Sequence, residues 1–276
     1  MIFHRITDWD DAYANAPNIP RGEEWPQRWA DLSGPFRTKM EEAGRAKLAL
    51  SYGERPRNLF DLFLPEGAPK GLVIFIHGGF WMKLDGTIFS HLAEGPMAHG
   101  FAVAVPSYTL CPDIRISGIV KEIGAAVEAA AALVEGPIYL TGHSAGGHLA
   151  TRMICTNSPL GEETRARIAD VVSISGVHDL RPLLNTKMNA SLHLDAAEAR
   201  AESPVLLEPV SGAKLCCWVG AGERSEFIRQ NALLANVWTG LGATAMTVEE
   251  PDRHHFNVVD GLADPEHALT RTLLMG

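Results

Sequence analysis

The chain has 276 residues, of which 46% are hydrophobic and 21% are charged, and its formal net charge at pH 7 is −9. These values are typical of a globular protein and exclude an intrinsically disordered chain, which needs low hydrophobicity and high net charge. The negative charge also argues against nucleic acid or an anionic membrane as a partner, because both attract basic proteins.

The longest apolar run, Ile123–Val134, contains Glu128 and is shorter than the roughly 20 apolar residues that a membrane span requires. Acidic residues stand where a secretory signal at the N-terminus would have an apolar core, so we expect a cytoplasmic protein. The four cysteines are too few and too scattered for a disulfide scaffold. Cys216–Cys217 lies in an apolar run that predicts a buried strand. Neither a CxxC nor an HExxH spacing occurs in the sequence, so no such motif indicates a metal site.

The first 50 residues are rich in Trp, Pro and charged residues and lack the alternation of a strand. We interpret residues 1–50 as short helices and loops. They form either a small helical cap over the main body or an extension packed on its surface. Residues 51–276 are predicted to form the main domain, in which no internal repeat occurs.

From residue 51 onward, short apolar segments alternate with helical patterns. Strands are predicted at Asn58–Leu64, Gly71–Ile76, Phe101–Val105, Ile138–Thr141, Asp170–Ser175, Leu215–Val219 and Thr244–Val248. Helices are predicted at Ser117–Val134, from the end of the segment 142–147 to about Cys155, at Glu226–Leu241 and at Pro265–Leu274. This alternation implies a mostly parallel, doubly wound α/β sheet, whose functional residues belong at the carboxyl ends of the strands.

Gly142-His143-Ser144-Ala145-Gly146 matches GxSxG directly after a predicted strand and before a helix. This is the context of a nucleophile elbow, in which a strained turn aims the serine Oγ out of the sheet. The turn also places the N–H of Ala145 at a helix N-terminus, where an anion is favoured. We predict that Ser144 is a catalytic nucleophile.

His77-Gly78-Gly79-Phe80-Trp81 directly follows another predicted strand. Consecutive glycines let the backbone approach a substrate carbonyl, and an oxyanion hole needs two or more fixed N–H donors. The N–H groups of Gly79 and Phe80, with Gly78 as an alternative, are predicted to form that hole together with Ala145.

On these motifs the sequence resembles the α/β-hydrolase superfamily from about Leu59 to the C-terminus. It is similar to the group that contains hormone-sensitive-lipase-type esterases and serine-hydrolase kynurenine formamidases. The motif at His77–Trp81 reads HGGFW, with Phe80 where esterases of this group usually have a third glycine, and GHSAGGH follows at 142–148. Weaker matches are Ser107-Tyr108 with Pro112, and Ser175-Gly176 with Asp179-Leu180. The resemblance implies an α/β-hydrolase fold and an arylformamidase that cleaves N-formyl-L-kynurenine.

A serine nucleophile needs a base, and in this fold the chain order is serine, acid, histidine. Only His254, His255 and His267 lie late enough in the chain, and the first two follow the last predicted strand. The resemblance places the catalytic imidazole directly before an aromatic residue, which favours His255. We interpret His254 as a loop residue that orients its neighbour and His267 as a helix-surface residue.

The acid is expected in the loop after Leu215–Val219, where the family usually has aspartate and this chain has none. Glu223 aligns best with the family's pattern and is predicted to hold the imidazole in the correct tautomer. Glu226 is the alternative. Asp179 and Asp252 are rivals that turn or loop capping explains better.

Trp81, Tyr108 and His148 are further candidates for contacts with a small-molecule substrate, although packing explains each of them as well. The predicted chemistry is acyl transfer to water through Ser144, which requires no metal or organic cofactor. A carboxylesterase for small or aromatic esters is the alternative function. A binding protein that has lost catalysis is disfavoured, because the serine, histidine and glycine motifs are all present. The sequence leaves open whether the chain forms a homodimer.

Overall fold

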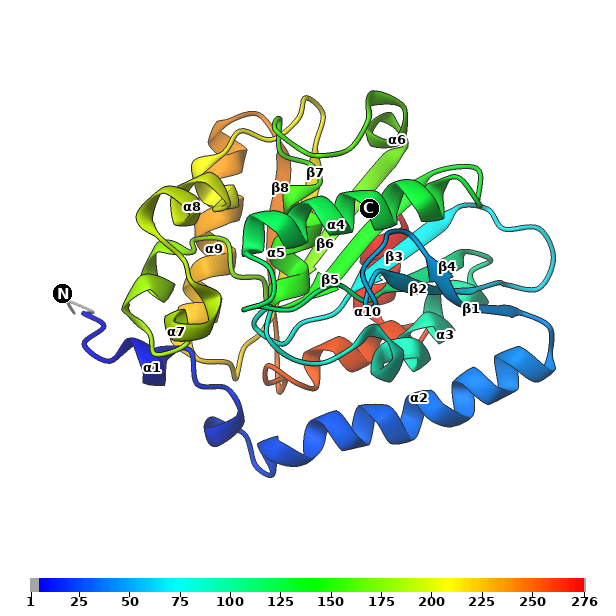
Figure 1. Cartoon of the computed structure of the whole chain (residues 1–276), viewed down its shortest axis with the longest axis horizontal. Helices are drawn as coiled ribbons and strands as arrows, with labels where there is room; N and C mark the ends of the chain where they lie inside the picture. Colours follow the sequence, from blue (N-terminus) through cyan, green and yellow to red (C-terminus); the bar gives the residue numbers. More distant parts are fainter. Residues whose placement is uncertain (1–4, 276) are drawn as a thin grey trace.

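The structure, a computed structural model, describes residues 5–275; residues 1–4 of the predicted N-terminal segment and Gly276 lie outside it. An eight-stranded sheet runs through its centre, with helices on both faces (Figure 1). The strand order is β1-β2-β4-β3-β5-β6-β7-β8. Strand β2 is antiparallel to β1 and β4, and all other neighbours are parallel. The prediction of a mostly parallel, doubly wound sheet is therefore confirmed.

All seven predicted strands are present, with ends that differ from the prediction by at most two residues. Their bounds are β2 Leu59–Phe63, β3 Leu72–Ile76, β4 Ala102–Pro106, β5 Ile138–His143, β6 Ile168–Ile174, β7 Lys214–Gly220 and β8 Thr244–Glu250. The eighth strand, β1 Ala46–Ser51, was not predicted. It lies at one edge of the sheet, and its residues alternate between exposed and half-buried positions.

Helices of very different length connect the strands. The α-helices are α1 Trp9–Ala12, α2 Trp25–Glu42, α3 Glu94–Ala98, α4 Ile116–Ala131, α5 Ala145–Arg152, α6 Glu162–Ala166, α7 Asn189–Leu192, α8 Ala196–Ala201, α9 Ser225–Gly240 and α10 Ala268–Met275. The 3-10 helices are η1 Ala16–Asn18, η2 Gly22–Glu24, η3 Gly86–Ala93, η4 Arg181–Asn185, η5 Pro204–Leu206 and η6 Val258–Ala263. The four predicted helices correspond to α4, α5, α9 and α10.

Helix α2 corrects the expectation that the N-terminal segment contains only short helices. It is 18 residues long even though Pro35 lies inside it, where proline removes a backbone hydrogen bond. One helical face explains its stability, because it buries side chains at the spacing of successive turns: Trp25, Trp29, Ser33, Phe36 and Met40. Helix α2 packs along η3, below the sheet in Figure 1.

The sheet separates two hydrophobic layers. Along β3, Leu72, Ile74 and Ile76 pack toward α4, α5 and α9, whereas Val73 and Phe75 pack toward α2, η3 and α10. A strand covered on both faces is apolar throughout, which explains why β3 and β4 read as continuous apolar runs. All four cysteines are buried as free thiols, and Cys216 and Cys217 lie within β7. Within residues 5–275, no helix is both long and apolar enough to cross a bilayer.

Candidate active site

The carboxyl ends of four parallel strands place the predicted site residues at one edge of the sheet. Strand β3 leads into the HGGFW segment, and its neighbour β5 leads into Ser144. Strands β7 and β8, which also pair in parallel, lead into the loops that carry Glu223 and His255. Since parallel strands end at the same edge, residues that are more than a hundred positions apart meet there.

Ser144 occupies a strained turn between β5 and α5. Its backbone angles are φ 56° and ψ −114°, outside the regions that residues with a side chain normally adopt. Its N–H donates to the Ile174 carbonyl at 2.8 Å, which ties the turn to β6. The glycines of the motif are required for space, because a Cβ on Gly142 would lie 2.3 Å from the Gly146 oxygen and one on Gly146 1.9 Å from the Ile76 oxygen. The local structure is that of a nucleophile elbow.

The HGGFW segment passes directly beside the serine. A Cβ on Gly78 would lie 3.1 Å from the Ser144 Cβ and 2.7 Å from the His143 oxygen, so only glycine fits there. Gly79, Phe80 and Trp81 all have positive φ, of 106°, 52° and 58°. Within residues 5–275, no backbone hydrogen bond is donated by the N–H groups of Gly79, Phe80 or Ala145. These three donors are therefore free to bind an anion.

Glu223 and His255 form a buried hydrogen-bonded pair. The Nδ1 of His255 donates to the Glu223 Oε2 at 2.6 Å, and both residues are less than 10% exposed. The other oxygen, Oε1, accepts from the Ser175 Oγ at 2.5 Å and from the Gly220 N–H at 2.9 Å. Because Nδ1 is engaged with the carboxylate, Nε2 is the ring nitrogen left to face a reacting group. The Phe227 ring packs 4.4 Å from the His255 ring.

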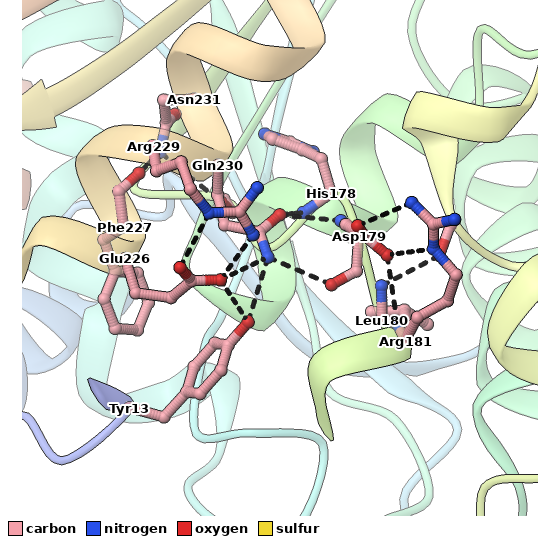
Figure 2. Close-up of polar contacts among 12 residues, drawn as sticks. Tyr13, His178, Asp179, Leu180, Arg181, Glu226, Phe227, Arg229, Gln230 and Asn231 are labelled. Atoms are coloured by element: carbon pink, nitrogen blue, oxygen red, sulfur yellow. Dashed lines mark hydrogen bonds and ion pairs between the residues drawn. The ribbon is translucent and has the colours of Figure 1, made fainter. Parts of the chain in front are cut away.

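The alternative acids have other partners (Figure 2). The Glu226 Oε1 accepts from the Tyr13 hydroxyl at 2.8 Å and from the Arg229 Nη2 at 2.7 Å. Asp179 forms a bidentate ion pair with Arg181, in which Nε donates to Oδ1 and Nη2 donates to Oδ2, each at 2.8 Å. Asp252 lies exposed in a turn with a φ of 60°. Of the four carboxylates considered, Glu223 is the one that the structure brings to the imidazole.

The other two candidate histidines, His254 and His267, accept hydrogen bonds from nearby backbone N–H groups. The Nδ1 of His254 accepts from the N–H of Phe256 at 3.2 Å and from that of Asn257 at 3.3 Å. Partial burial lowers the pKa of His254. The Nδ1 of His267 accepts from the Leu269 N–H at 3.2 Å, at the start of α10, and its Nε2 lies 3.2 Å from the Glu250 Oε1. No group of three or more His, Cys, Asp or Glu side chains that could hold a metal ion occurs in the part of the chain that the structure describes.

Two residues near the pair received no positioning role in the sequence analysis. His143 Nε2 donates to the backbone carbonyl of His255 at 2.7 Å, and burial, with His255 nearby, lowers the pKa of His143 well below its usual value. Ser175, at the end of β6, holds Glu223 as described above. Its position in the sequence could have indicated Ser175, because this hydroxyl residue directly follows β6. Strand β6 is the neighbour of β7, and Glu223 lies in the loop after β7.

A cavity of about 390 Å³ joins these groups. Ser144, His255 and Phe80 line it from the strand ends. The N-terminal segment supplies half of the lining residues, among them Tyr13 and Trp29. The segment is anchored by Tyr13, whose hydroxyl points to α9 in Figure 2 and bonds with Glu226, as given above. Residues 10–29 therefore cover the edge of the sheet at which Ser144 and His255 lie.

Trp81, Tyr108 and His148 are fully buried and are not among the residues that line this cavity. The Tyr108 hydroxyl donates to the His77 carbonyl at 3.0 Å and steadies the HGGFW segment from behind. His148 donates to the Glu202 carbonyl at 2.7 Å, and the Trp81 ring packs 5.2 Å from the His148 ring. The structure places none of these three residues in the wall of the cavity, so their predicted contact with substrate has no support there.

Comparisons with known proteins show what the chain as a whole is similar to. A protein-family model described as BD-FAE matches residues 60–211. The kynurenine formamidase of Salmo salar is 28% identical over 240 residues, which are 82% of this chain and 80% of that protein. The region that the family model matches includes the HGGFW segment and the turn at Ser144.

Solved structures match the whole architecture. A protein of Silicibacter sp. TM1040, provisionally described as a thioesterase, has a TM-score of 0.92 and 48% identity, covering 96% of this chain and 98% of its own. An esterase of Pyrobaculum calidifontis has a TM-score of 0.70 and 16% identity, covering 91% of this chain and 90% of its own. At that identity the esterase is evidence for the fold alone.

Proposed function

The chain belongs to the BD-FAE family of α/β-hydrolases and is a hydrolase, and on that premise we propose that it is a serine hydrolase with the triad Ser144, Glu223 and His255. The observation that carries the proposal is the buried 2.6 Å hydrogen bond between Glu223 and His255, next to a serine in a strained turn on the same cavity. A carboxylate that fixes Nδ1–H leaves Nε2 as the base for the Ser144 hydroxyl.

In the proposed reaction, the Ser144 Oγ attacks the substrate carbonyl carbon as His255 takes the hydroxyl proton. The N–H groups of Gly79, Phe80 and Ala145 bind the oxyanion, and Glu223 stabilises the imidazolium. His255 then protonates the leaving amine, the C–N bond breaks, and an acyl-enzyme remains. Water, activated by the neutral His255, attacks the acyl-enzyme and releases the acid and free Ser144.

The proposed substrate is an aryl formamide, N-formyl-L-kynurenine in particular, which would place the reaction in tryptophan catabolism. The Salmo salar relative supports this choice through the activity that it is named for. The cavity also suits it, because Phe80 lines the space next to the oxyanion donors and formyl is the smallest acyl group. Trp29, Phe256 and Tyr13 give the remaining wall aromatic faces that could stack an arylamine.

A fluorophosphonate probe tests the nucleophile, and Ser144→Ala should abolish labelling while the protein remains folded. His255→Asn should lower turnover by about 10³-fold or more. His254→Asn is its matched control, because asparagine keeps an acceptor for the loop N–H groups, and it should retain most of the activity. Equal losses in the two histidine variants would contradict the assignment of the base.

A carboxylesterase with the same residues is the second candidate function. The Silicibacter protein, which is 48% identical and provisionally described as a thioesterase, supports cleavage of an ester-type bond over an amide bond. Relative turnover of N-formyl-L-kynurenine and p-nitrophenyl acetate distinguishes the two functions. A preference of orders of magnitude for the ester would reject the formamidase.

A further inference from the structure

Two polar side chains in the wall of the catalytic cavity have no hydrogen-bond partner. Asn15 is 4% exposed, and neither its Oδ1 nor its Nδ2 is bonded to any residue between 5 and 275. The indole Nε1–H of Trp29, a residue that is 1% exposed, is also unpaired there. Both residues line the cavity that contains Ser144 and His255. Buried polar groups without partners are rare and costly, so these two call for an explanation.

The usual structural roles of an asparagine do not account for Asn15. It stands at the N-cap position of η1, yet its side chain makes no capping bond. Its backbone is fixed, because its carbonyl accepts from the Asn18 N–H at 2.9 Å and the neighbouring Tyr13 is tied to α9. The backbone is thus anchored while the carboxamide, with two donor hydrogens and an acceptor oxygen, is left for another partner.

Charged groups of both signs line the same cavity. Asp10 and Glu23 of the N-terminal segment and Lys83 of the segment after HGGFW are among the lining residues, and Glu23 and Lys83 are exposed. Both Asp10 oxygens contact Lys187: Oδ1 accepts from the Lys187 backbone N–H at 2.7 Å, and Oδ2 lies 3.7 Å from the Lys187 Nζ. Lys83 has no ion pair within the described residues. A ligand that carries both a carboxylate and an ammonium would find complementary charges in this cavity.

We propose that Asn15 and the Trp29 N–H form a polar subsite that hydrogen-bonds an α-amino-acid head group on the leaving-group side of the substrate. Asn15 is then a specificity-determining residue. The inference rests on the proposed formamidase function and deepens it, because it assigns substrate discrimination to the N-terminal segment. A site built to bond a polar group rejects an analogue without it, since the buried amide is then left unpaired.

Two substrates that share one scissile bond separate this subsite from the catalytic groups: N-formyl-L-kynurenine, and 2′-formamidoacetophenone, which lacks the amino-acid head group. Asn15→Leu should lower kcat/KM for the first by about 10- to 100-fold, mainly through KM, and should change it for the second by less than about threefold. The variant should also raise the thermal unfolding midpoint, because leucine removes an unsatisfied buried amide.

Asn18→Leu is the matched control, since this exposed carboxamide belongs to the same segment, donates to the Ala14 carbonyl at 2.8 Å and does not line the cavity. It should leave the ratio of the two kcat/KM values unchanged. Equal losses on both substrates, no loss on either, or the same effect in Asn18→Leu would overturn the subsite while leaving the proposed function in place. Failure of the wild-type enzyme to hydrolyse either formamide would overturn both.

Binding without turnover gives an independent measurement. Kynurenine is the expected product and has the same head group. Its Kd for the Ser144→Ala variant should be at least about tenfold lower than its Kd for the Ser144→Ala/Asn15→Leu double variant. Equal Kd values in this calorimetric titration would overturn the proposal.

Discussion

Replacing Glu223 with glutamine is the most direct test of the proposed triad, because it changes one buried oxygen to an NH₂ group of nearly the same size. In the structure all three partners of this carboxylate donate to it: His255 to Oε2, and Ser175 and the Gly220 N–H to Oε1. A glutamine has one acceptor oxygen, and the two donors at Oε1 favour it there. The NH₂ group then faces His255 Nδ1 and forces the imidazole into the tautomer with Nε2 protonated.

The magnitude follows from that change of tautomer. An imidazole with Nε2 protonated cannot accept the Ser144 proton, and the imidazolium loses its counter-charge in a buried site. A hydrogen bond to a charged group is worth about 1.5–3 kcal/mol. The same isosteric replacement in a serine-protease triad lowers kcat by about 10⁴-fold, which corresponds to about 5 kcal/mol. We expect Glu223→Gln to lower kcat by 10³- to 10⁴-fold, on the order of that case.

Steady-state hydrolysis of the formamide and the rate of fluorophosphonate labelling measure this loss, with circular dichroism to verify folding. Glu226→Gln is the matched control: the same substitution three residues away, in a carboxylate that bonds with Tyr13 and Arg229. It should retain activity within about threefold. Wild-type activity in Glu223→Gln, or an equal loss in Glu226→Gln, would refute the assignment of the acid.

Three further predictions concern the support of the site. Ser175→Ala should lower kcat roughly 10- to 100-fold with little change in KM, because its hydroxyl holds Glu223 and does not line the cavity. Tyr13→Phe should lower the free energy of unfolding by about 1.5–3 kcal/mol, measured in urea, because the buried Glu226 loses a donor. Stability should fall as the pH is lowered from about 7.5 to 5.5, because unfolded histidines take up protons that the buried ones cannot. Burial lowers the pKa of His77, His91, His143, His148 and His178, to about 4 for His77 and His91.

Each of these predictions has an outcome that would contradict it. For Ser175, a rise in KM at unchanged kcat would indicate a substrate contact instead of support for the acid. For Tyr13, an unchanged urea midpoint would mean that the hydrogen bond from its hydroxyl to Glu226 does not contribute to the free energy of unfolding. For the histidines, each depressed pKa removes up to about 1.4 kcal/mol of stability per pH unit below 6.5, until the folded-state pKa is reached. Burial raises the pKa of Asp170 and Asp260 to about 6, and these fewer groups act in the opposite direction. A free energy of unfolding that stays constant or rises as the pH is lowered from 7.5 to 5.5 would refute the predicted direction of this pH dependence.

The strands and both glycine-rich turns were predictable because their causes are local. A strand buried on both faces must be apolar at every position, as β3 and β4 are. The elbow needs small residues around Ser144 because the strand and helix backbones nearly touch there. Helix α2 was missed for a reason that is not local: Pro35 argues against a helix, and burial of one face against η3 outweighs that cost.

Sequence by itself determined the order of the elements, the strand–turn–helix segment at Ser144 and the short set of candidate acids and bases. It could not choose between Glu223 and Glu226 by physics, because they stand three residues apart at the junction of one loop with α9. Tertiary structure decided which carboxylate reaches an imidazole 32 positions later, since the parallel pairing of β7 and β8 brings those two loops together. It also placed Asn15 and Trp29 in the wall of the cavity that Ser144 lines, although more than a hundred residues separate them from Ser144 in the chain, and no local pattern encodes this arrangement.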